Sequence, residues 1–581
     1  MDRLVEHGYT HCFFVAGGNS MHLLDAARKR MRCIPFVHEV SAAIAAEYFN
    51  ETQIRKEQRA FVMVTAGPGL TNAITGIAGA YLESRELLVL GGQVKSTDLA
   101  SGGLRQRGIQ EIDGVSAVRP FTKLAKRLDS PITGVELDNA LRLTSEGRPG
   151  PVFLELCLDT QAREVEKDSH SNSSFQPVAT DLAVEYLTEL SRLIQDSQRP
   201  VLLIGGGISR SMKATLMDVL SNIQVPTMTT WNGADRISSD HPLYFGRPNT
   251  WGQRSSNILL QQSDLVVALG TRLGLQQTGF NWREFAPVAK VVQVDIDPAE
   301  LEKGHPSIYL GLCTDANEVL SHMKSLPPQS WSEWVDFAVD VRSSLPLSED
   351  SNSVDPRFIN SYDFVLELSK HVADSDLVVP CSSGGAFTVM MQAFMQKANQ
   401  TIITNKGLAS MGYGLAGAVG AALAQPRARV VLVEGDGGFS QNLQELATVS
   451  RNRLNVKMFV FANNGYASIR MTQTNYFGGQ YLGCDTESGL GFPNWKTLAE
   501  TYQIPFAELT SLLWQSDSFM KAWSSPDPLL VMVPIDPVQT YFPKISSRVT
   551  TTGSMESAPL HLMTPDLDER VHNKVFKYLR S

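Results

Sequence analysis

Short apolar runs separated by longer amphipathic segments recur along the 581 residues of the chain. In the first third of the chain the runs fall at residues 12–16, 60–64, 87–90 and 152–156. Such runs are typical of buried strands, and their alternation with helical segments predicts a parallel sheet covered on both faces. The pattern returns at residues 200–204, 265–269 and 291–294, and again at 377–379, 430–433 and 458–461. We therefore predict an α/β fold of three doubly wound parallel-sheet domains.

Two polar stretches separate these domains. Residues 164–176, EVEKDSHSNSSFQ, and residues 343–356, SSLPLSEDSNSVDP, have the composition of linkers. The predicted domains are residues 1–163, 178–342 and 357–537. A tail of residues 538–581, rich in Pro, Ser and Met, predicts one last helix near residues 569–578.

The composition narrows the class of protein. Hydrophobic residues make up 43% and charged residues 19% of the chain, as in globular enzymes. The net charge of −9 gives no sign of the basic surface that nucleic-acid binding requires. Six cysteines without a CxxC pair indicate reduced thiols, and no apolar run approaches the roughly 20 residues that span a bilayer. The N-terminus lacks the layout of a signal peptide. We predict a cytoplasmic protein that binds neither nucleic acid nor membrane.

The strongest candidate site lies in residues 430–470, VVLVEGDGGFSQNLQELATVSRNRLNVKMFVFANNGYASIR. Two apolar runs flank a segment with helical spacing at residues 443–450, which predicts a βαβ unit. The strands of such a unit are parallel and end at the same edge of the sheet, where open α/β folds bind ligands. Asp436 and Asn463 are therefore predicted to lie side by side.

The glycines around Asp436 suit a phosphate. Gly435 and Gly437 let the backbone approach a ligand closely, and the N–H groups of the next helix can bind phosphate oxygens. One carboxylate, one amide oxygen and a diphosphate are ligands that Mg²⁺ accepts. The alternative interpretation is a pair of ordinary glycine turns, because such short motifs also occur by chance.

The GDG and NNG motifs at this spacing resemble the thiamine-diphosphate signature of the acetohydroxyacid synthase and pyruvate decarboxylase superfamily. The resemblance implies pyrimidine-binding, central and diphosphate-binding domains. It implies that Asp436, Asn463 and the Gly465 carbonyl bind Mg²⁺ on the diphosphate. Ala462 stands where many members have asparagine, and a gapless alignment selects Asn463 rather than Asn464 as the ligand. The resemblance also places Gly435, Gly437, Gly438, Tyr466 and Ala467 at the cofactor.

Glu39 is the first candidate for catalysis. It follows a predicted strand at residues 33–37 and opens a helix of small apolar residues, where a carboxylate loses hydration. The alternative is an ordinary carboxylate stabilised by the helix dipole. The segment VHEVSAAIAAE resembles a family segment whose glutamate hydrogen-bonds to N1′ of the cofactor's aminopyrimidine. The resemblance implies that Glu39 exchanges a proton with N1′ and so helps to activate the thiazolium C2.

Other segments of the first domain also resemble the family. Residues 65–72, TAGPGLTN, resemble a turn that lines the cofactor cleft, which implicates Gly67, Pro68 and Asn72. Gln110 resembles an active-site glutamine. Lys123 occupies the position of a lysine that the synthases often carry, with a solvated surface lysine as the alternative. The histidine pair of the simple pyruvate decarboxylases is missing from KSTDLASGGLRQRG, which favours a carboligase.

In the third domain, residues 404–414, TNKGLASMGYG, resemble the segment that shapes the cofactor. The resemblance implies that Met411 wedges between the two cofactor rings and that the Ala409 carbonyl accepts from the 4′-amino group. A large conformable side chain suits the wedge, whereas plain core packing is the alternative. Gly384 and Gly385, after a predicted strand, are expected near the diphosphate.

The central domain carries an incomplete resemblance to an FAD site. The residues concerned are Gly206, Gly207, Thr230, Gly270, Arg272 and Asp295. The synthases continue RFDDR-TG from the arginine, whereas residues 272–279 read RLGLQQTG and lack two of the charges. FAD is therefore a possible cofactor, and an empty site is the alternative.

Segments after residue 463 resemble a branch of acetolactate-synthase-like proteins associated with sugar and polysaccharide biosynthesis. The leading hypothesis is a carboligase that decarboxylates a 2-keto acid, pyruvate first among them, and transfers the two-carbon unit to a second carbonyl compound. Alternatives are a non-oxidative 2-keto acid decarboxylase that releases an aldehyde and a catalytically silent regulatory subunit. The resemblance further implies a homodimer or homotetramer with the active site between subunits.

Overall fold

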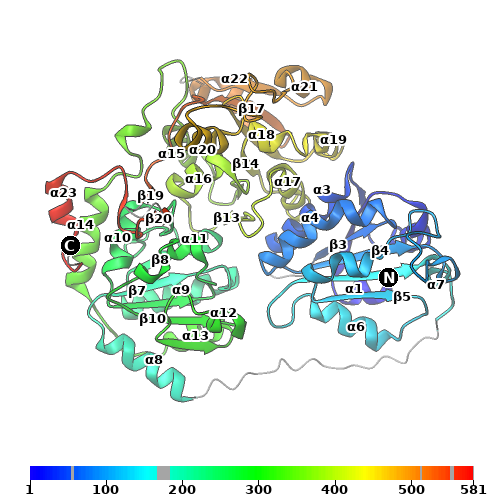
Figure 1. The fold of residues 1–581 in the computed structure, drawn as a ribbon, viewed down its shortest axis with the longest axis horizontal. Coiled ribbons are helices and arrows are strands. Elements are labelled where there is room, and N and C mark those ends of the chain that lie inside the picture. The colour runs from blue at the N-terminus through cyan, green and yellow to red at the C-terminus, as the bar shows by residue number, and fades with distance from the viewer. Residues whose placement is uncertain (54–57, 166–183, 511–512, 550–554, 580–581) are drawn as a thin grey trace. The chain divides into compact units, whose positions relative to one another are not determined.

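The computed structural model describes residues 1–53, 58–165, 184–510, 513–549 and 555–579. Three parallel sheets dominate these residues, one in each predicted domain, as the doubly wound pattern requires (Figure 1). Each apolar run named above contributes to a strand. The predicted fold class is therefore confirmed. The linker predicted at residues 164–176 falls almost entirely outside the described residues.

The sheet of the first domain has six parallel strands, with short strands at both edges. Their order is β2 (Arg32–Pro35), β1 (Tyr9–Phe14), β3 (Arg59–Val64), β4 (Leu87–Gln93), β6 (Pro151–Cys157) and β5 (Leu124–Leu128). The principal helices are α2 (Met21–Ala27), α3 (Glu39–Thr52), α4 (Pro68–Leu82) and α6 (Gly134–Leu143).

The central sheet has five parallel strands. Their order is β11 (Leu310–Cys313), β10 (Lys290–Asp295), β9 (Leu265–Leu269), β7 (Pro200–Ile204) and β8 (Thr227–Thr229). Its longer helices are α8 (Val184–Asp196), α9 (Lys213–Ile223), α10 (Arg254–Gln262), α13 (Ala316–Met323) and α14 (Ser332–Ser344).

The third sheet contains the predicted βαβ unit. Its parallel strands include, side by side, β12 (Leu377–Val379), β14 (Val430–Gly435), β15 (Val456–Ala462), β17 (Leu529–Pro534) and β16 (Phe506–Glu508). A short helix α18 (Asp436–Phe439), a 3₁₀ turn η8 (Leu443–Glu445) and α19 (Leu446–Arg451) connect β14 with β15. Other helices are α16 (Gly384–Ala393), α17 (Tyr413–Ala424), α20 (Ala467–Phe477), α21 (Trp495–Thr501) and α22 (Asp517–Ser524).

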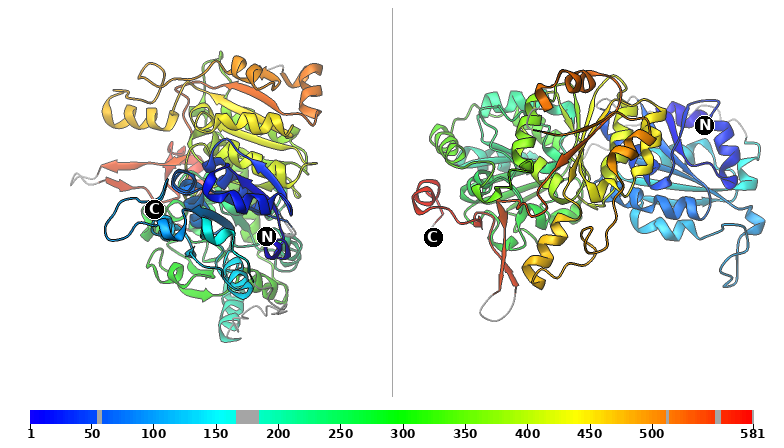
Figure 2. Two further views of the ribbon diagram at one scale, coloured as in Figure 1. Left: turned by 90° about the vertical axis from the view of Figure 1, so that its right-hand side faces the viewer. Right: turned by 90° about the horizontal axis from the view of Figure 1, so that it is seen from above.

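By its internal contacts the chain divides into two compact units. One contains Met1–Phe175, Ser375–Phe387 and Ile403–Pro537, and so combines the first domain with most of the predicted third domain. The other contains Gln176–Asp374, Thr388–Ile402 and Val538–Ser581, and so combines the central domain and the tail with residues 357–374 and 388–402 of the predicted third domain. The tail includes an antiparallel ribbon of β19 (Ser547–Val549) and β20 (Met555–Ser557), drawn in red in Figure 2, and ends in α23 (Glu569–Val575).

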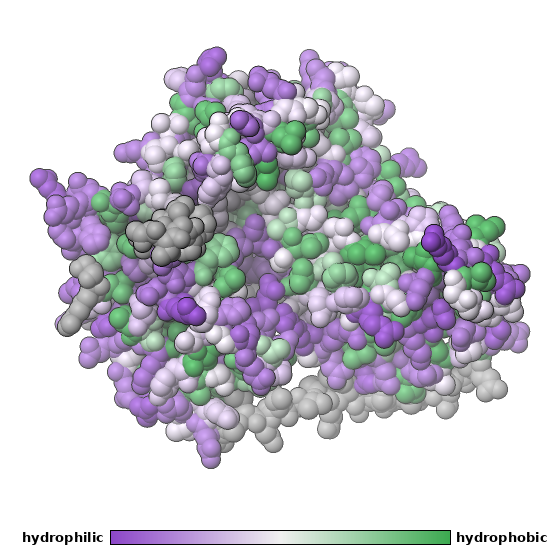
Figure 3. Space-filling view, viewed as in Figure 1, coloured by the Kyte–Doolittle hydropathy of each residue, from purple (hydrophilic) through white to green (hydrophobic). Residues whose placement is uncertain are grey.

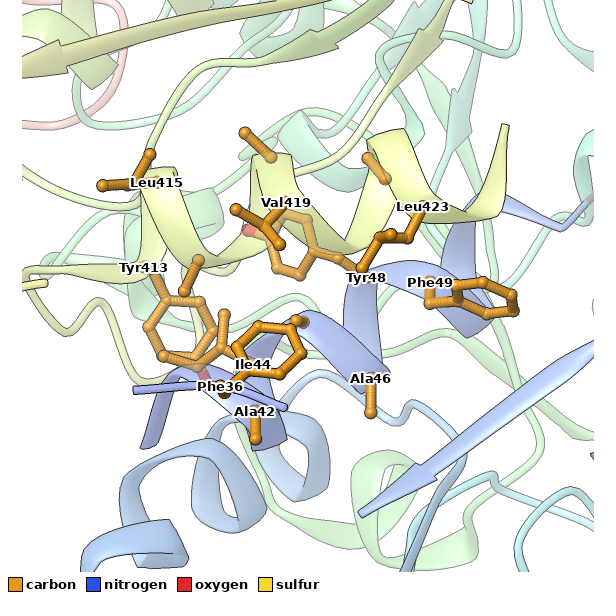
Figure 4. Close-up of a cluster of buried hydrophobic side chains, with 14 of the residues drawn as sticks. Phe36, Ala42, Ile44, Ala46, Tyr48, Phe49, Tyr413, Leu415, Val419 and Leu423 are labelled. Carbon is orange, nitrogen blue, oxygen red and sulfur yellow. The ribbon is translucent and has the colours of Figure 1, made fainter. Parts of the chain in front are cut away.

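Helices α3 and α17 join the first and third domains within their unit. Every residue of α17, YGLAGAVGAALA, is buried, and Figure 4 shows Val419 and Leu423 beside Tyr48 of α3. Small side chains let the two helices approach closely. A Cβ added at Gly420 would lie 2.0 Å from the Ala45 carbonyl oxygen, so the backbones themselves are in contact.

Hydrophilic and hydrophobic residues are interspersed on the face drawn in Figure 3. In the described part of the chain, no helix is both long enough and apolar enough to cross a membrane.

Candidate active site

Glu39 begins helix α3 directly after the end of β2. The preceding His38 caps the helix, because its ring Nδ1 accepts a hydrogen bond from the Val40 N–H at 3.3 Å. The Glu39 side chain is buried, and its Oε2 accepts from Nδ2 of Asn72 at 3.1 Å. The structure therefore brings together two residues that the sequence assigns to the same cofactor site from different motifs.

The turn before α4 packs against the loop that holds Gln110. Gly67 has a φ of +62°, and a Cβ there would lie 2.4 Å from the Gln110 carbonyl oxygen. Pro68 is the first residue of α4. Gln110 itself has a φ of +62° and an exposed side chain. These residues lie past the ends of β3 and β4, at the same sheet edge as Glu39.

Glu111 stabilises that loop and was missed by the sequence analysis. Its carboxylate accepts from the backbone N–H groups of Ala100, Arg107 and Gly108 at 2.5, 2.8 and 2.9 Å. Burial raises the pKa of this group, but the three backbone donors outweigh burial and hold it below its usual value. A charged Glu111 thus fixes the backbone next to Gln110.

Lys123 lies elsewhere. It directly precedes β5, and its backbone N–H donates to the carbonyl of Pro151, the first residue of β6. Strand starts and strand ends occupy opposite edges of a parallel sheet. The Lys123 ammonium donates to the Glu146 carbonyl at 2.5 Å, at the edge opposite to Glu39. The structure therefore does not bring Lys123 to the candidate site.

In the third domain, Asp436 and Asn463 lie side by side as predicted. The Asp436 carboxylate accepts from its neighbour Gly437 N–H at 2.7 Å and from the Asn463 N–H at 3.1 Å. Burial raises the pKa of Asp436 to about 7, against the effect of these backbone donors. A divalent cation at this carboxylate would favour its charged form.

The side chain of Asn463 has a buried oxygen that a ligand could bind. Its side-chain Oδ1 is buried and has no hydrogen-bond partner among the described residues. Leaving such an oxygen unsatisfied costs roughly 1–3 kcal/mol, and a cation would satisfy it. The neighbouring Asn464 has an exposed side chain and a φ of +58°. The donor set of Asp436 and Asn463 fits Mg²⁺, and the geometry favours Asn463 over Asn464.

The glycines around Asp436 and Asn463 differ in how much space surrounds them. A Cβ at Gly437 would lie 2.3 Å from the Tyr466 ring, whereas Cβ atoms at Gly435 and Gly384 would meet nothing within 4 Å. Open space beside two glycines at strand ends suits a bound diphosphate. Gly438 packs against the buried Glu434. The remaining predicted positions here are Gly385, the second residue of α16, and Ala467, the first residue of α20.

The Met411 loop is tied to the same sheet edge. The Ser382 hydroxyl donates to the Ser410 carbonyl at 2.5 Å, which links the loop to the segment before Gly384. On the other side, Asn442 donates to the Gly412 carbonyl at 2.8 Å, and Gln441 Nε2 lies 3.7 Å from the Met411 sulfur. Ala409 has a φ of +56°, a conformation that alanine rarely adopts. The loop that holds Ala409 and Met411 therefore lies between the segment before Gly384 and the segment that follows α18.

The sequence analysis missed two buried glutamates near these loops. Glu434 precedes the GDG turn, and its carboxyl accepts from the Leu415 N–H in α17 at 3.2 Å. Burial raises the pKa of Glu434 to about 8. Glu445 accepts from the backbone N–H groups of Val37 and His38 at 3.2 and 3.1 Å. Glu445 therefore connects the diphosphate-binding domain to the start of the helix that carries Glu39.

Two glycine-containing loops of the central domain pack directly against each other. A Cβ at Gly205 would lie 2.1 Å from the Gly270 carbonyl oxygen, and the Gly207 N–H donates to the same oxygen at 2.9 Å. The buried Arg236 donates to the carbonyls of Gly206 and Ile208. Direct contact of the two loops explains the glycines without a ligand. Of the other residues assigned to FAD, Thr230 and Asp295 are buried and Arg272 is partly exposed. The packing therefore gives FAD no independent support.

Within the described residues, no three His, Cys, Asp or Glu side chains form a group that could bind a metal by themselves. A cation at Asp436 would therefore depend on amide, backbone and ligand oxygens, which is the arrangement that Mg²⁺ on a diphosphate favours. Three parallel-sheet domains with these residues at their strand ends define a thiamine diphosphate enzyme.

Family models match all three domains. The N-terminal thiamine pyrophosphate (TPP) binding domain of TPP enzymes matches residues 1–117, the central domain residues 187–323 and the C-terminal TPP binding domain residues 383–533. The "Probable acetolactate synthase large subunit" of Methanocaldococcus jannaschii is 30% identical over 520 residues, covering 86% of this chain and 85% of the relative. The "Acetolactate synthase isozyme 1 large subunit" of Escherichia coli K12 is 28% identical, covering 93% of each chain. The "Acetolactate synthase large subunit" of Lactococcus lactis is 28% identical, covering 99% of this chain and 97% of the relative.

The chain belongs to the acetolactate synthase-like family of thiamine-diphosphate-dependent enzymes. The family assignment made from the sequence is thereby confirmed.

Proposed function

We propose that this enzyme is a carboligase that decarboxylates a 2-keto acid, with pyruvate as the first candidate, and joins the two-carbon unit to a second carbonyl compound. The observation that carries the cofactor site on which the proposal rests is the buried Oδ1 of Asn463, which has no hydrogen-bond partner among the described residues and belongs to a residue whose backbone N–H donates to Asp436. The length over which the acetolactate synthase relatives match supports the carboligase outcome.

The roles of the residues follow from their positions. Asp436, Asn463 and the Gly465 carbonyl would hold Mg²⁺ on the diphosphate, with Gly384 and Gly435 leaving room for it. When bound, thiamine diphosphate supplies the carbon nucleophile that attacks the 2-keto group and accepts the electrons left by CO₂. Met411, on its anchored loop, would hold the two rings in a bent arrangement.

We assign the proton transfer to Glu39. Its buried carboxyl would exchange a proton with N1′ of the aminopyrimidine, and Asn72 orients that carboxyl from the side. We assign Gln110 to substrate contact, because its side chain is exposed on a loop that Glu111 holds. The six free thiols agree with a cytoplasmic enzyme.

The proposed reaction can be tested by identifying the products that the enzyme forms from pyruvate. Purified enzyme with thiamine diphosphate and Mg²⁺ is incubated with pyruvate alone and then with a panel of aldehydes, 2-keto acids and keto sugars. Carboligation products support the proposal. Free acetaldehyde as the sole product with every acceptor would identify a decarboxylase instead, and a chain that binds no cofactor would be a silent subunit. FAD binding stays a prediction, tested by the flavin absorbance of the purified protein.

We also propose a homodimer or homotetramer in which Glu39 of one subunit completes the site of another. Large apolar side chains are exposed in both domains concerned, namely Leu104, Ile109, Tyr476, Phe477 and Leu482. Mixing inactive Glu39→Gln and Asp436→Asn variants tests this arrangement. If sites are shared, a mixed dimer contains one site free of both substitutions, and activity reappears. If each site lies within one chain, the mixture stays inactive.

A further inference from the structure

We propose that Arg470 and Asp485 are positioning residues that hold the metal-binding loop of Asn463, Asn464 and Gly465 in its binding conformation. The inference rests on the proposed Mg²⁺ site. It assigns a role to two residues that lie outside the GDG and NNG motifs and does not require either of them to touch the cation.

The loop has a backbone that must be held in place. Asn464 has a φ of +58° and Gly465 a φ of +147°, so two successive residues occupy regions that L side chains rarely adopt. A Cβ at Gly465 would lie 2.0 Å from the Cys484 carbonyl oxygen. Such conformations persist only where the surrounding structure fixes them.

Arg470, in the first turns of α20, is buried and reaches back to this loop. Its Nη2 donates to the backbone carbonyls of Asn463 and Asn464, each at 3.3 Å. Its Nη1 donates to the Pro537 carbonyl at 2.7 Å, which anchors the guanidinium to the end of the third domain. A planar guanidinium with several fixed donors can bridge successive carbonyls, which a lysine ammonium cannot reproduce.

Asp485 holds Arg470 and the loop from the other side. Its Oδ2 lies 3.4 Å from Arg470 Nε, and its Oδ1 accepts from the Ser488 N–H at 2.8 Å and the Ser488 hydroxyl at 2.7 Å. The backbone of the same turn pairs with the loop, because Asp485 forms a β-bridge with Gly465 and the Tyr466 N–H donates to Cys484 at 2.8 Å. The metal-binding loop is thus enclosed between Arg470 and the 484–488 turn.

This arrangement separates the loop's oxygens into two sets. Arg470 binds the backbone carbonyls of Asn463 and Asn464, while the buried Asn463 side-chain oxygen has no hydrogen-bond partner in the part of the chain that the structure describes. Residues that orient metal ligands without touching the metal typically affect metal affinity by 10–100-fold. We therefore expect Arg470 and Asp485 to act on the affinity for Mg²⁺ first.

The test titrates the full-length apoenzyme with Mg²⁺ at saturating thiamine diphosphate, and with thiamine diphosphate at saturating Mg²⁺, by tryptophan fluorescence or calorimetry. Wild type is compared with Arg470→Met, Arg470→Lys and Asp485→Asn. The matched control is Arg453→Met, because Arg453 forms an exposed ion pair with Asp527 in the same domain. If Arg470→Met does not fold, Arg470→Lys carries the test.

We expect a 10–100-fold weaker Mg²⁺ affinity in the Arg470 variants, a smaller loss in Asp485→Asn and no change in the control. Thiamine diphosphate affinity should return to that of wild type at saturating Mg²⁺. Unchanged Mg²⁺ affinity in folded Arg470 variants would overturn the inference, as would cofactor affinity that stays weak at saturating Mg²⁺. A wild type that binds no Mg²⁺ with thiamine diphosphate would instead refute the proposed function.

Discussion

The side-chain amide of Asn72 donates a hydrogen bond of 3.1 Å to the carboxyl of Glu39. Asn72 lies in the second turn of α4 and Glu39 at the start of α3, two helices that pack against each other. Because Asn72 can donate to either protonation state of the carboxyl, it can hold Glu39 in one orientation while a proton is gained and lost.

The first prediction concerns Glu39 itself. Glu39→Gln preserves the size of the side chain but removes the exchangeable proton, so we expect turnover of pyruvate to fall by at least about 100-fold. Binding of thiamine diphosphate with Mg²⁺ should persist, because we assign the diphosphate to residues of the third domain. Steady-state kinetics and fluorescence titration measure the two effects separately. Near-normal turnover would remove Glu39 from the mechanism.

The second prediction concerns Asn72. Asn72→Ala leaves the Glu39 carboxyl without its side-chain donor, and we expect kcat to fall by about 5-fold, which corresponds to the loss of a hydrogen bond worth about 1 kcal/mol. The exposed Asn139, in α6 of the same domain, gives the matched control Asn139→Ala. In the double variant with Glu39→Gln the Asn72 effect should largely vanish. Fully additive losses would show that Asn72 acts independently of Glu39.

Local patterns predict the fold and the pairing of Asp436 with Asn463. The runs at 200–204, 265–269 and 377–379 coincide with β7, β9 and β12, because central strands of a parallel sheet are buried on both faces and read as continuous apolar segments. The edge strand β5, LAKRL, carries two consecutive charged residues in place of a continuous apolar run, and the apolar pattern does not predict it. Asp436 and Asn463 were placed together because a βαβ unit dictates which strand ends meet.

Contacts between distant segments could not be predicted in this way. Glu445 binds the backbone of Val37 and His38, about 400 residues earlier, and no local pattern indicates this pairing. Lys123 was considered because of its motif, but its place at the start of β5 puts it at the wrong edge of the sheet. Arg470 belongs to a segment that resembles the family, but no local pattern predicts that its guanidinium binds the backbone of Asn463.

The third prediction separates the two adjacent asparagines. Asn463→Ala removes the unpartnered buried oxygen, so Mg²⁺-dependent binding of thiamine diphosphate should weaken by at least about 10-fold. Asn464→Gly is the control, because glycine accepts the positive φ of that exposed position. Titrations with each cofactor component measure the effect, and chelation with EDTA should abolish binding until Mg²⁺ is restored. A larger loss in Asn464→Gly would reverse the ligand assignment.

The fourth prediction concerns Glu445. Glu445→Ala removes the acceptor for the Val37 and His38 N–H groups and so loosens the start of α3. We expect kcat to fall by about 10-fold or more while the affinity for Mg²⁺ changes little, because a displaced Glu39 affects the chemical step. Glu500→Ala, at an exposed position of α21, is the control. Loss of Mg²⁺ affinity with unchanged kcat would assign Glu445 to the diphosphate site instead.

The fifth prediction is a pH dependence of stability that arises from Glu155 in β6. Burial raises the pKa of this carboxyl from 4.5 to about 7, and its Oε2 has no partner among the described residues. Because the folded state retains the proton that the unfolded state loses, this contribution is complete below about pH 4.5 and is lost as pH rises to about 7. The loss amounts to about 3 kcal/mol of the free energy of unfolding.

Melting temperatures between pH 5 and pH 8 should therefore fall more steeply for wild type than for Glu155→Gln, whose side chain carries no titrating proton. The exposed Glu185→Gln variant should follow wild type, and parallel curves for all three proteins would contradict the assignment.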